Sequence, residues 1–245
     1  MREAEETQHR LYEQSPLREI TGETIRPGGF VLTDRAMAFC RFPIRSRILD
    51  VGCGAAATVE RLRATYGMDA FGVDLSAALL DEGRRRNPNL VLIRASAEAL
   101  PCQNAELDGI LCECVLSIVA DSERALREFH RLLGDRGRLI VTDVYARCPE
   151  KNERIHDLPR ISCLTGALPE KEIRERFQSN GFRIALWEDH SIVLRELAAR
   201  LILRYGCMDA FWNLNCSKEA SDTVITAIAS MKPGYYLLVA EKEIS

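Results

Sequence analysis

Two acidic residues and two glycines have the types and spacing of a nucleoside-binding site. Asp50 lies near the end of a short apolar run, Gly52 and Gly54 follow it, and Asp74 ends a second apolar run 22 residues after Gly52. Glycines in a turn after a strand let the backbone pass close to a ligand, because no Cβ occupies that space. An acid at the end of the next strand can accept hydrogen bonds from both hydroxyls of a ribose. The stretch therefore predicts a βαβ unit that binds a nucleoside.

The residues around the first glycine turn indicate which kind of nucleoside cofactor this unit binds. Gly52-x-Gly54-x-x-Ala57 also fits the dinucleotide fingerprint, but Asp50 puts a carboxylate where a pyrophosphate would lie, and no basic residue lies nearby to offset it. An anion there would be repelled, whereas an ammonium and a sulfonium suit that carboxylate. S-adenosylmethionine has this cationic end, and its adenosine would lie at Asp74. An NAD-linked oxidoreductase and a cofactor-binding module without turnover are the alternatives.

Five ordered stretches resemble the class I S-adenosylmethionine-dependent methyltransferases of the methyltransferase type 11, UbiE-like kind. They lie between about Arg47 and Tyr145, at residues 49–54, 73–76, 95–101, 107–111 and 132–140. The resemblance implies an α/β fold, a Rossmann-like doubly wound sheet of seven mostly parallel strands with an antiparallel last strand. It also implies a set of cofactor-binding residues, namely Asp50, Gly52, Cys53, Gly54, Asp74, Leu75, Ser96, Ala97, Glu98, Cys112 and Glu113.

One position in this set departs from the family pattern. Residues 95–98 match the segment that holds the adenine, where an acid commonly receives the exocyclic amine, and here that position is Ser96. A hydroxyl accepts this hydrogen bond more weakly than a carboxylate does. We therefore expect adenine binding to depend on the Ala97 backbone and on apolar packing.

Length, charge and cysteine content limit the class of protein. A chain of 245 residues is enough for one well-cored α/β domain. Its 33 basic and 36 acidic residues give a net charge of −3, which offers no footprint for nucleic acid or for an anionic membrane, so a small-molecule partner is expected. No apolar run approaches about 18 residues and the start lacks a signal peptide's apolar region, so we expect a cytoplasmic protein. Nine cysteines without a CxxC pair, and four histidines, indicate reduced thiols rather than disulfides or a structural zinc.

Hydrophobic patterning predicts a single domain over residues 1–245. We expect strands at 47–51, 70–74, 90–94, 107–111, 138–142, 182–188 and 235–241, and helices at 33–42, 58–66, 77–86, 122–133, 170–180, 191–205 and 217–231, with Thr33 as an N-cap. The N-terminal segment, 1–45, is expected to be a lid over the cofactor, as is common in the family, or a solvated helix. Residues 146–168 are expected to form a cap insertion over the crevice. Residues 191–232 form a helical insertion that packs outside the sheet or forms a homodimer contact.

A general base is missing from the predicted acceptor site. His130 is expected on the helix before the fifth strand, and His156 and His190 in the cap and at a strand end, so each is interpreted as a surface or core histidine. The Asn/Asp-Pro-Pro-aromatic run of amine methyltransferases that act on DNA and RNA bases is absent after the fourth strand. Methylation of base amino groups is therefore not expected.

Cysteines take the place of that base. Cys114, after the fourth strand, and Cys163, 49 residues later, resemble two of the cysteines with which arsenite methyltransferases bind trivalent arsenic. The local match covers residues 114–121, 142–145 and 163–168, and makes Asp143 and Tyr145 further substrate-binding candidates. Thiolates select soft centres, and three-coordinate arsenic keeps a lone pair that attacks a methyl group without a base.

The match to arsenite methyltransferases lacks one ligand. The family's remaining arsenic ligand follows the first glycine turn, where this chain has Thr58-Val59. A third thiolate would have to come from one of four other cysteines, Cys112, Cys148, Cys207 or Cys216. The alternative interpretation is an organic small-molecule acceptor, with Cys114 and Cys163 as small apolar residues of the crevice.

Overall fold

A mixed sheet forms the centre of the protein. The computed structural model describes residues 11–13, 16–148, 162–214, 225–226 and 228–243. Its strands are β1 (Arg47–Val51), β2 (Asp69–Asp74), β3 (Leu92–Arg94), β4 (Leu107–Glu113), β5 (Leu133–Ala146), β6 (Leu168–Pro169), β7 (Phe182–Asp189) and β8 (Pro233–Lys242). The order across the sheet is β3-β2-β1-β4-β5-β8-β7, and the two-residue β6 pairs with β5 outside this path.

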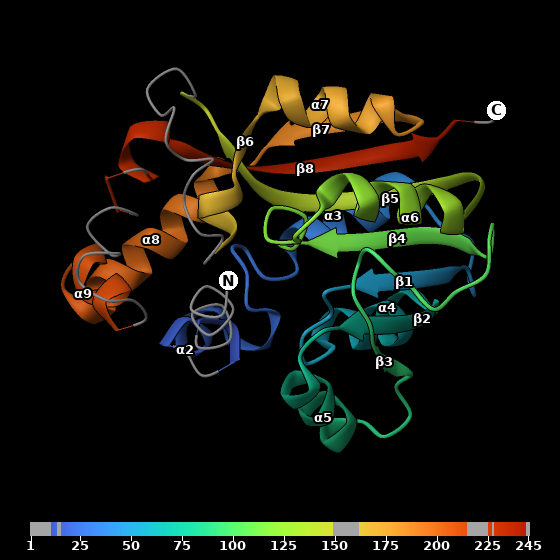
Figure 1. Ribbon diagram of the computed structural model, residues 1–245. Helices are drawn as coiled ribbons and strands as arrows, with labels where there is room; N and C mark the ends of the chain where they lie inside the picture. Colours follow the sequence, from blue (N-terminus) through green and yellow to red (C-terminus); the bar gives the residue numbers. More distant parts are fainter. Residues whose placement is uncertain (1–10, 14–15, 149–161, 215–224, 227, 244–245) are drawn as a thin grey trace.

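Helices cover both faces of the sheet (Figure 1). They are α2 (Pro16–Thr21), α3 (Val31–Cys40), α4 (Ala57–Tyr66), α5 (Ala77–Arg86), α6 (Ser122–Leu132), α7 (Glu170–Ser179), α8 (Ser191–Tyr205) and α9 (Met208–Asn213), with 3-10 turns η1 (Gly22–Thr24) and η4 (Cys163–Gly166). Buried side chains of α6 and α7 pack on one face of the sheet. Buried side chains of α3, α4 and α5 pack on the other. Each face therefore buries its own apolar layer.

The structure confirms the expected doubly wound α/β fold. Strands β1, β2, β3, β4 and β5 pair in parallel, and β8 is antiparallel to both β5 and β7. The last strand is antiparallel, as the family resemblance implied, and it lies between β5 and β7. The sheet differs from the expected seven strands only in the short β6, which makes eight.

Two boundaries differ from prediction in ways that matter for the site. Strand β4 continues two residues beyond the predicted end, so Cys112 and Glu113 belong to the strand. The predicted N-cap at Thr33 is wrong, because Phe30 occupies the N-cap position of α3 and Thr33 lies buried within the helix. The Thr33 hydroxyl instead donates to Glu113. Parts of the predicted cap (149–161) and of the predicted helix 217–231 (217–224 and 227) lie outside the described residues.

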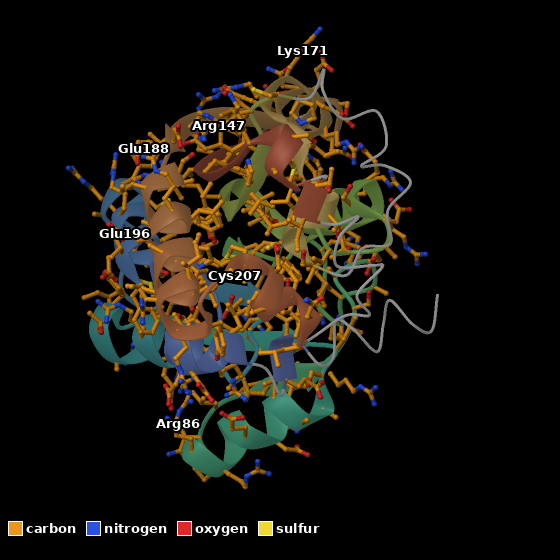
Figure 2. The ribbon with its side chains drawn as sticks, turned by 90° about the vertical axis from the view of Figure 1, so that its left-hand side faces the viewer. Arg86, Arg147, Lys171, Glu188, Glu196 and Cys207 are labelled. Carbon is orange, nitrogen blue, oxygen red and sulfur yellow. The ribbon has the colours of Figure 1, made fainter. Side chains whose placement is uncertain are left out.

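Helix α2 and the α8–α9 pair lie beyond the carboxyl ends of β1 and β4. In Figure 1 the arrowheads of these two strands point toward that side, and Figure 2 shows α8 running across it. Leu11 and Ile20 share a small core there with three buried side chains of α8 and α9, Leu201, Phe211 and Trp212. Among the described residues, none of the helices combines the length and the apolar character needed to cross a membrane.

Candidate active site

Asp74 lies at the carboxyl end of β2 beside the glycine turn. One of its carboxylate oxygens accepts the Gly54 N–H at 2.8 Å and the other accepts the Ser76 N–H at 2.8 Å. Burial raises the pKa of Asp74, while these backbone donors favour its charged form. The turn and the acid are therefore held together as one unit, with carboxylate lone pairs left for two hydroxyl groups of a ligand.

The two glycines of this turn are required for different reasons. A Cβ at Gly52, which has φ +73°, would lie 2.2 Å from Cγ2 of Val115. A Cβ at Gly54, φ +53°, would meet nothing closer than Cδ1 of Ile25 at 3.8 Å. The expectation that both glycines make room for a ligand therefore needs correction for Gly52, whose missing Cβ makes room for Val115. A Cβ at Gly54 would make only ordinary van der Waals contacts, so this position is less crowded than Gly52.

A buried ion pair lies behind the turn. Arg26 contacts Glu113 at 2.9 Å, and both side chains are almost completely buried. The hydroxyls of Thr33 and Thr58 donate to the two Glu113 oxygens at 2.8 and 3.2 Å, and Arg26 donates to both hydroxyls. This network fixes Glu113 from α3, α4 and the N-terminal segment at once.

Asp50 lies next to this network with one oxygen unused. Its Oδ2 is buried and has no hydrogen-bond partner within the described part of the chain. Burial raises the pKa of Asp50, as does the nearby charge of Glu113, while Arg26 opposes the shift. The expectation of no basic residue near Asp50 is therefore wrong, because Arg26 reaches in from far along the chain. The unused oxygen and the two further acids, Glu113 and Asp74, suit a cationic ligand.

Two other predicted cofactor-binding residues, Cys53 and Cys112, have buried side chains. Cys53 is buried, and its thiol lies 2.6 Å from where a Cβ on Gly72 would be. Cys112 is fully buried in the main core, and burial raises the pKa of its thiol well above the ordinary range. The N–H groups of Gly52 and Cys53 both donate to the Val73 carbonyl. Neither thiol therefore faces the crevice.

The adenine segment carries its own hydrogen bonds. Ser96 donates its hydroxyl to the Glu98 carboxylate. The other Glu98 oxygen accepts the N–H groups of Ala120 and Asp121 at 3.1 and 3.2 Å, so Glu98 supports the turn before α6. Ala97 is buried in the core, and Leu75 at the end of β2 is 61% exposed. The apolar surface available to a base therefore comes from Leu75.

Three predicted acceptor residues meet at the carboxyl ends of β4 and β5. The Sγ atoms of Cys114 and Cys163 and a carboxylate oxygen of Asp143 all lie within 4.8 Å of one another. Cys114 follows β4 with φ +62°, a conformation that costs energy for a residue with a Cβ. Its N–H donates to the Thr142 carbonyl at 2.6 Å. The strained turn points the thiol toward the start of η4, where Cys163 lies.

Two groups of this thiol cluster, which consists of Cys114, Asp143 and Cys163, have raised pKa values. Hydrogen bonding to Cys163 and then burial raise the pKa of the Cys114 thiol well above its ordinary range. Burial raises the pKa of Asp143 to about 6, against the opposing effect of N–H and hydroxyl donation from Ser117 at 2.9 and 2.7 Å. Cys114 is therefore a neutral thiol at neutral pH, and a ligand that binds it must displace its proton.

Two tyrosine hydroxyls that sequence reasoning missed flank the thiol cluster. Tyr12 accepts the Cys163 N–H at 3.2 Å. Tyr235 lies 3.3 Å from the Thr142 hydroxyl and interacts with Cys114. Arg26, Tyr12 and Tyr235 all come from stretches distant from the motifs, and no local pattern marks them.

Tyr145, the fourth predicted substrate residue, is not part of the cluster. Its ring packs edge-on against Trp187 and Tyr236, with ring centres 5.7 and 6.2 Å apart. Among the histidines, His130 lies edge-on to Phe182 and His190 contacts Glu188 at 2.9 Å, and His156 lies outside the described residues.

Three of the four cysteines considered for a third thiolate lie within the described residues, and none of these three belongs to the cluster. Cys112 is in the core and Cys148 is half-buried beside Met231. Cys207 is exposed at the start of α9, as Figure 2 shows. Cys216 lies outside the described residues. Within the described chain, the third group of the cluster is the carboxylate of Asp143.

Comparison with known proteins identifies the central stretch. Residues 49–141 match the family described as Methyltransferase domain. The chain is similar to the O-methyltransferase resE of Aspergillus sclerotiorum, with 28% identity over 58% of this chain and 56% of that protein. It is similar to the arsenite methyltransferase of Rattus norvegicus, with 26% identity over 56% of this chain and 42% of that protein. The chain thus matches about half the length of these curated relatives.

The structural similarity covers a larger share of the chain than the sequence similarity does. The structure of phosphoethanolamine N-methyltransferase 2 from Haemonchus contortus, in complex with phosphomonomethylethanolamine and S-adenosylhomocysteine, superposes with a TM-score of 0.72. The match covers 93% of this chain and 56% of that one, at 17% sequence identity. Nearly the whole chain therefore shares the Rossmann-like fold of that protein.

Proposed function

We propose that this chain, a member of the class I S-adenosylmethionine-dependent methyltransferases, transfers a methyl group to trivalent arsenic or a similarly soft centre bound by Cys114 and Cys163. The observation that carries the proposal is the convergence of these two thiols with Asp143 within 4.8 Å. Soft thiolates select soft metalloids over hard cations. The similarity to the arsenite methyltransferase of Rattus norvegicus supports the same acceptor.

S-adenosylmethionine fits the crevice at the carboxyl ends of β1 and β2. Asp74 would accept the two ribose hydroxyls, and the missing side chain of Gly54 would let the backbone pass close to the cofactor. The unused Asp50 oxygen would receive its ammonium, with Arg26 as the partner for its carboxylate. When bound, this cofactor supplies an electrophilic methyl group. The buried acids favour its cationic end over a pyrophosphate.

The thiol cluster has the composition needed to hold arsenous acid. Two thiols displace two of its three hydroxyl groups, each thiol proton leaving with a hydroxyl as water, so two As–S bonds form and two As–O bonds break. The remaining oxygen would hydrogen-bond to Asp143. The arsenic keeps its lone pair throughout, and this lone pair is the nucleophile. No histidine base is needed, in agreement with the positions of His130 and His190 outside the cluster.

An organic acceptor is the second candidate, and one observation favours it. A cleft beside Asp143 is lined mainly by apolar side chains of α6, α7 and neighbouring strands, among them Leu116, Leu126, Phe177 and Tyr236. Asp143, whose pKa is raised to about 6, could take the proton of a hydroxyl or amine acceptor bound there. In this case the two thiols would be dispensable.

Methyl transfer from labelled S-adenosylmethionine to arsenite in excess glutathione tests the proposal. We expect wild-type transfer, and at least about a hundredfold loss in Cys114→Ser and in Cys163→Ser, since oxygen is a poor ligand for a soft centre. The exposed Cys207→Ser is the matched control and should behave as wild type. Calorimetry with S-adenosylmethionine and with NAD checks the cofactor in every variant.

The outcomes separate the candidates. Loss of transfer in both site variants with intact cofactor binding supports the thiol-bound acceptor. A wild type that binds the cofactor but methylates no arsenic favours the organic acceptor. Tight binding of NAD in place of S-adenosylmethionine would contradict both.

A further inference from the structure

Residues 11–13 lie between the cofactor crevice and the thiol cluster and contact both. Glu13 accepts the Ser76 hydroxyl at 2.5 Å, and the Ser76 N–H donates to Asp74, the expected ribose ligand. The preceding residue, Tyr12, accepts the Cys163 N–H at 3.2 Å. Two adjacent residues thus touch the two halves of the site.

The Tyr12 hydroxyl is directed at the thiols themselves. Burial raises the pKa of Tyr12 well above its ordinary range, and the adjacent Cys163 and Cys114 raise it further. Because the Tyr12 oxygen accepts the Cys163 N–H, its own O–H can donate a hydrogen bond to a neighbouring sulfur. A thiolate formed when a ligand binds would be a stronger acceptor of that hydrogen bond than the neutral thiol.

A firm anchor holds this short stretch. Leu11 is buried against Leu201, Phe211 and Trp212 of the α8–α9 pair. Farther along, Arg18 of α2 pairs with Glu82 of α5, and Arg200 donates to the Ile20 carbonyl. The α8–α9 insertion therefore serves as the wall against which the N-terminal segment packs, a role beyond the external packing or dimer contact expected from sequence.

We propose that residues 11–13 are a strap that couples cofactor binding to acceptor binding, with Tyr12 positioning Cys163 and Glu13 contacting the ribose side through Ser76. A cofactor that holds Glu13 in place thereby holds Tyr12 against Cys163, so the thiol cluster binds an acceptor more tightly when the cofactor is present. By thermodynamic reciprocity, an acceptor in the thiol cluster tightens cofactor binding by the same factor. This inference rests on the proposed acceptor.

Binding of phenylarsine oxide, a trivalent arsenical that needs no turnover, tests the strap. Its affinity is measured by calorimetry with and without saturating S-adenosylhomocysteine. In the wild type we expect about 5- to 50-fold tighter binding in the presence of S-adenosylhomocysteine, the usual range for coupled sites. Tyr12→Phe should weaken the arsenical about tenfold and remove most of the enhancement, because the hydrogen bond to sulfur is lost. Glu13→Gln should leave the affinity without cofactor unchanged and reduce the enhancement.

Tyr66→Phe is the matched control. It removes a hydroxyl that donates to Asp34 at 2.8 Å, away from both halves of the site, and should show wild-type coupling. Equal arsenical affinity with and without S-adenosylhomocysteine in the wild type would overturn the coupling and leave the proposed acceptor intact. Wild-type coupling in Tyr12→Phe would overturn the role of Tyr12. A wild type that binds S-adenosylhomocysteine but no arsenical would overturn the proposed acceptor, and the strap with it.

Discussion

The cofactor crevice and the thiol cluster lie next to each other, but the crevice is rich in acidic groups and the cluster in thiols. The crevice gathers three acids, Asp50, Asp74 and Glu113, around one internal ion pair with Arg26, and leaves one carboxylate oxygen without a partner. The thiol cluster keeps Cys114 protonated through burial and hydrogen bonding. The crevice offers buried carboxyl groups whose charged forms are favoured by a cationic ligand, whereas the cluster offers a thiol that loses its proton when a ligand binds. Electrostatic attraction selects the cofactor, and sulfur chemistry selects the acceptor.

Among these predictions, substitution of Arg26 in the cofactor crevice should have the largest effect on the free energy of unfolding. We expect Arg26→Met to lower the free energy of unfolding by about 3 to 5 kcal/mol, because Glu113 and Asp50 would be left buried without a cation. Urea denaturation measures the loss. Arg35→Met breaks an ion pair with Glu188 whose side chains are 41% and 26% exposed, and should cost less than about 1 kcal/mol. Equal losses in the two variants would mean that the crevice does not depend on its internal ion pair.

Gly52, in the turn of the cofactor crevice, lies against Val115, the residue that follows Cys114 of the thiol cluster. Gly52→Ala should lower the free energy of unfolding by about 2 to 4 kcal/mol, from the clash with Val115 together with the positive φ. Gly22→Ala, at φ +67° with nothing within 4 Å of the added Cβ, carries the backbone cost alone, about 1 to 2 kcal/mol. Thermal unfolding of both variants and of Gly52→Ala with Val115→Ala measures the steric part. A double variant no more stable than Gly52→Ala would contradict the role of Val115.

The glycine turn of the cofactor crevice and two residues of the thiol cluster could be predicted from the sequence. The turn from β1 to α4 and the acid that ends β2 form a contiguous motif, so Asp50, Gly54 and Asp74 were located before the structure was known. Parallel strands bring their carboxyl ends together, and this explains why Cys114 and Asp143 could be expected in one place. Both inferences use local order and a general property of sheets.

Two site residues, Arg26 and Tyr12, could not be predicted from the sequence, because long-range packing brings them to the site. Arg26 and Tyr12 reach the site because the N-terminal segment packs against α8 and α9, which follow it by more than 160 residues in the chain. No periodicity or motif records such a contact. Glu113 was expected in a turn, but β4 continues through it, since its side chain is neutralised by partners from three other segments. Contacts between segments that are distant in the sequence determine where these residues lie, and a local pattern does not indicate such contacts.

The pH dependence of stability distinguishes the thiol cluster from its surroundings. Asp143 has a pKa of about 6 in the folded protein, against 3.8 as its ordinary value. Its contribution to stability is therefore full below pH 3.8 and is lost as the pH rises to about 6. Asp143→Asn lacks this dependence, so the variant should gain on the wild type by up to about 3 kcal/mol across that range.

Urea denaturation at several pH values measures this gain. Asp34→Asn serves as the control of opposite sign, because Arg61 lowers the pKa of the Asp34 carboxyl, whose stabilising effect is lost as the pH falls. A constant difference between Asp143→Asn and wild type at all pH values would show that folding does not shift the pKa of the Asp143 carboxyl.

Substitution of Asp74 tests whether the two halves are chemically separate. Asp74→Ala should weaken S-adenosylmethionine binding by about 1.5 to 3 kcal/mol, because hydrogen bonds to a charged acceptor are lost. The thiol cluster contains no group that depends on this acid, so phenylarsine oxide should bind the variant with wild-type affinity when no cofactor is present. Calorimetry measures both affinities on the same preparation, and Asp81→Asn, an exposed acid on α5 paired with Arg84, is the control. Unchanged cofactor affinity in Asp74→Ala would remove the ribose assignment, whereas a parallel loss of arsenical affinity would show that one electrostatic unit, rather than two, governs the site.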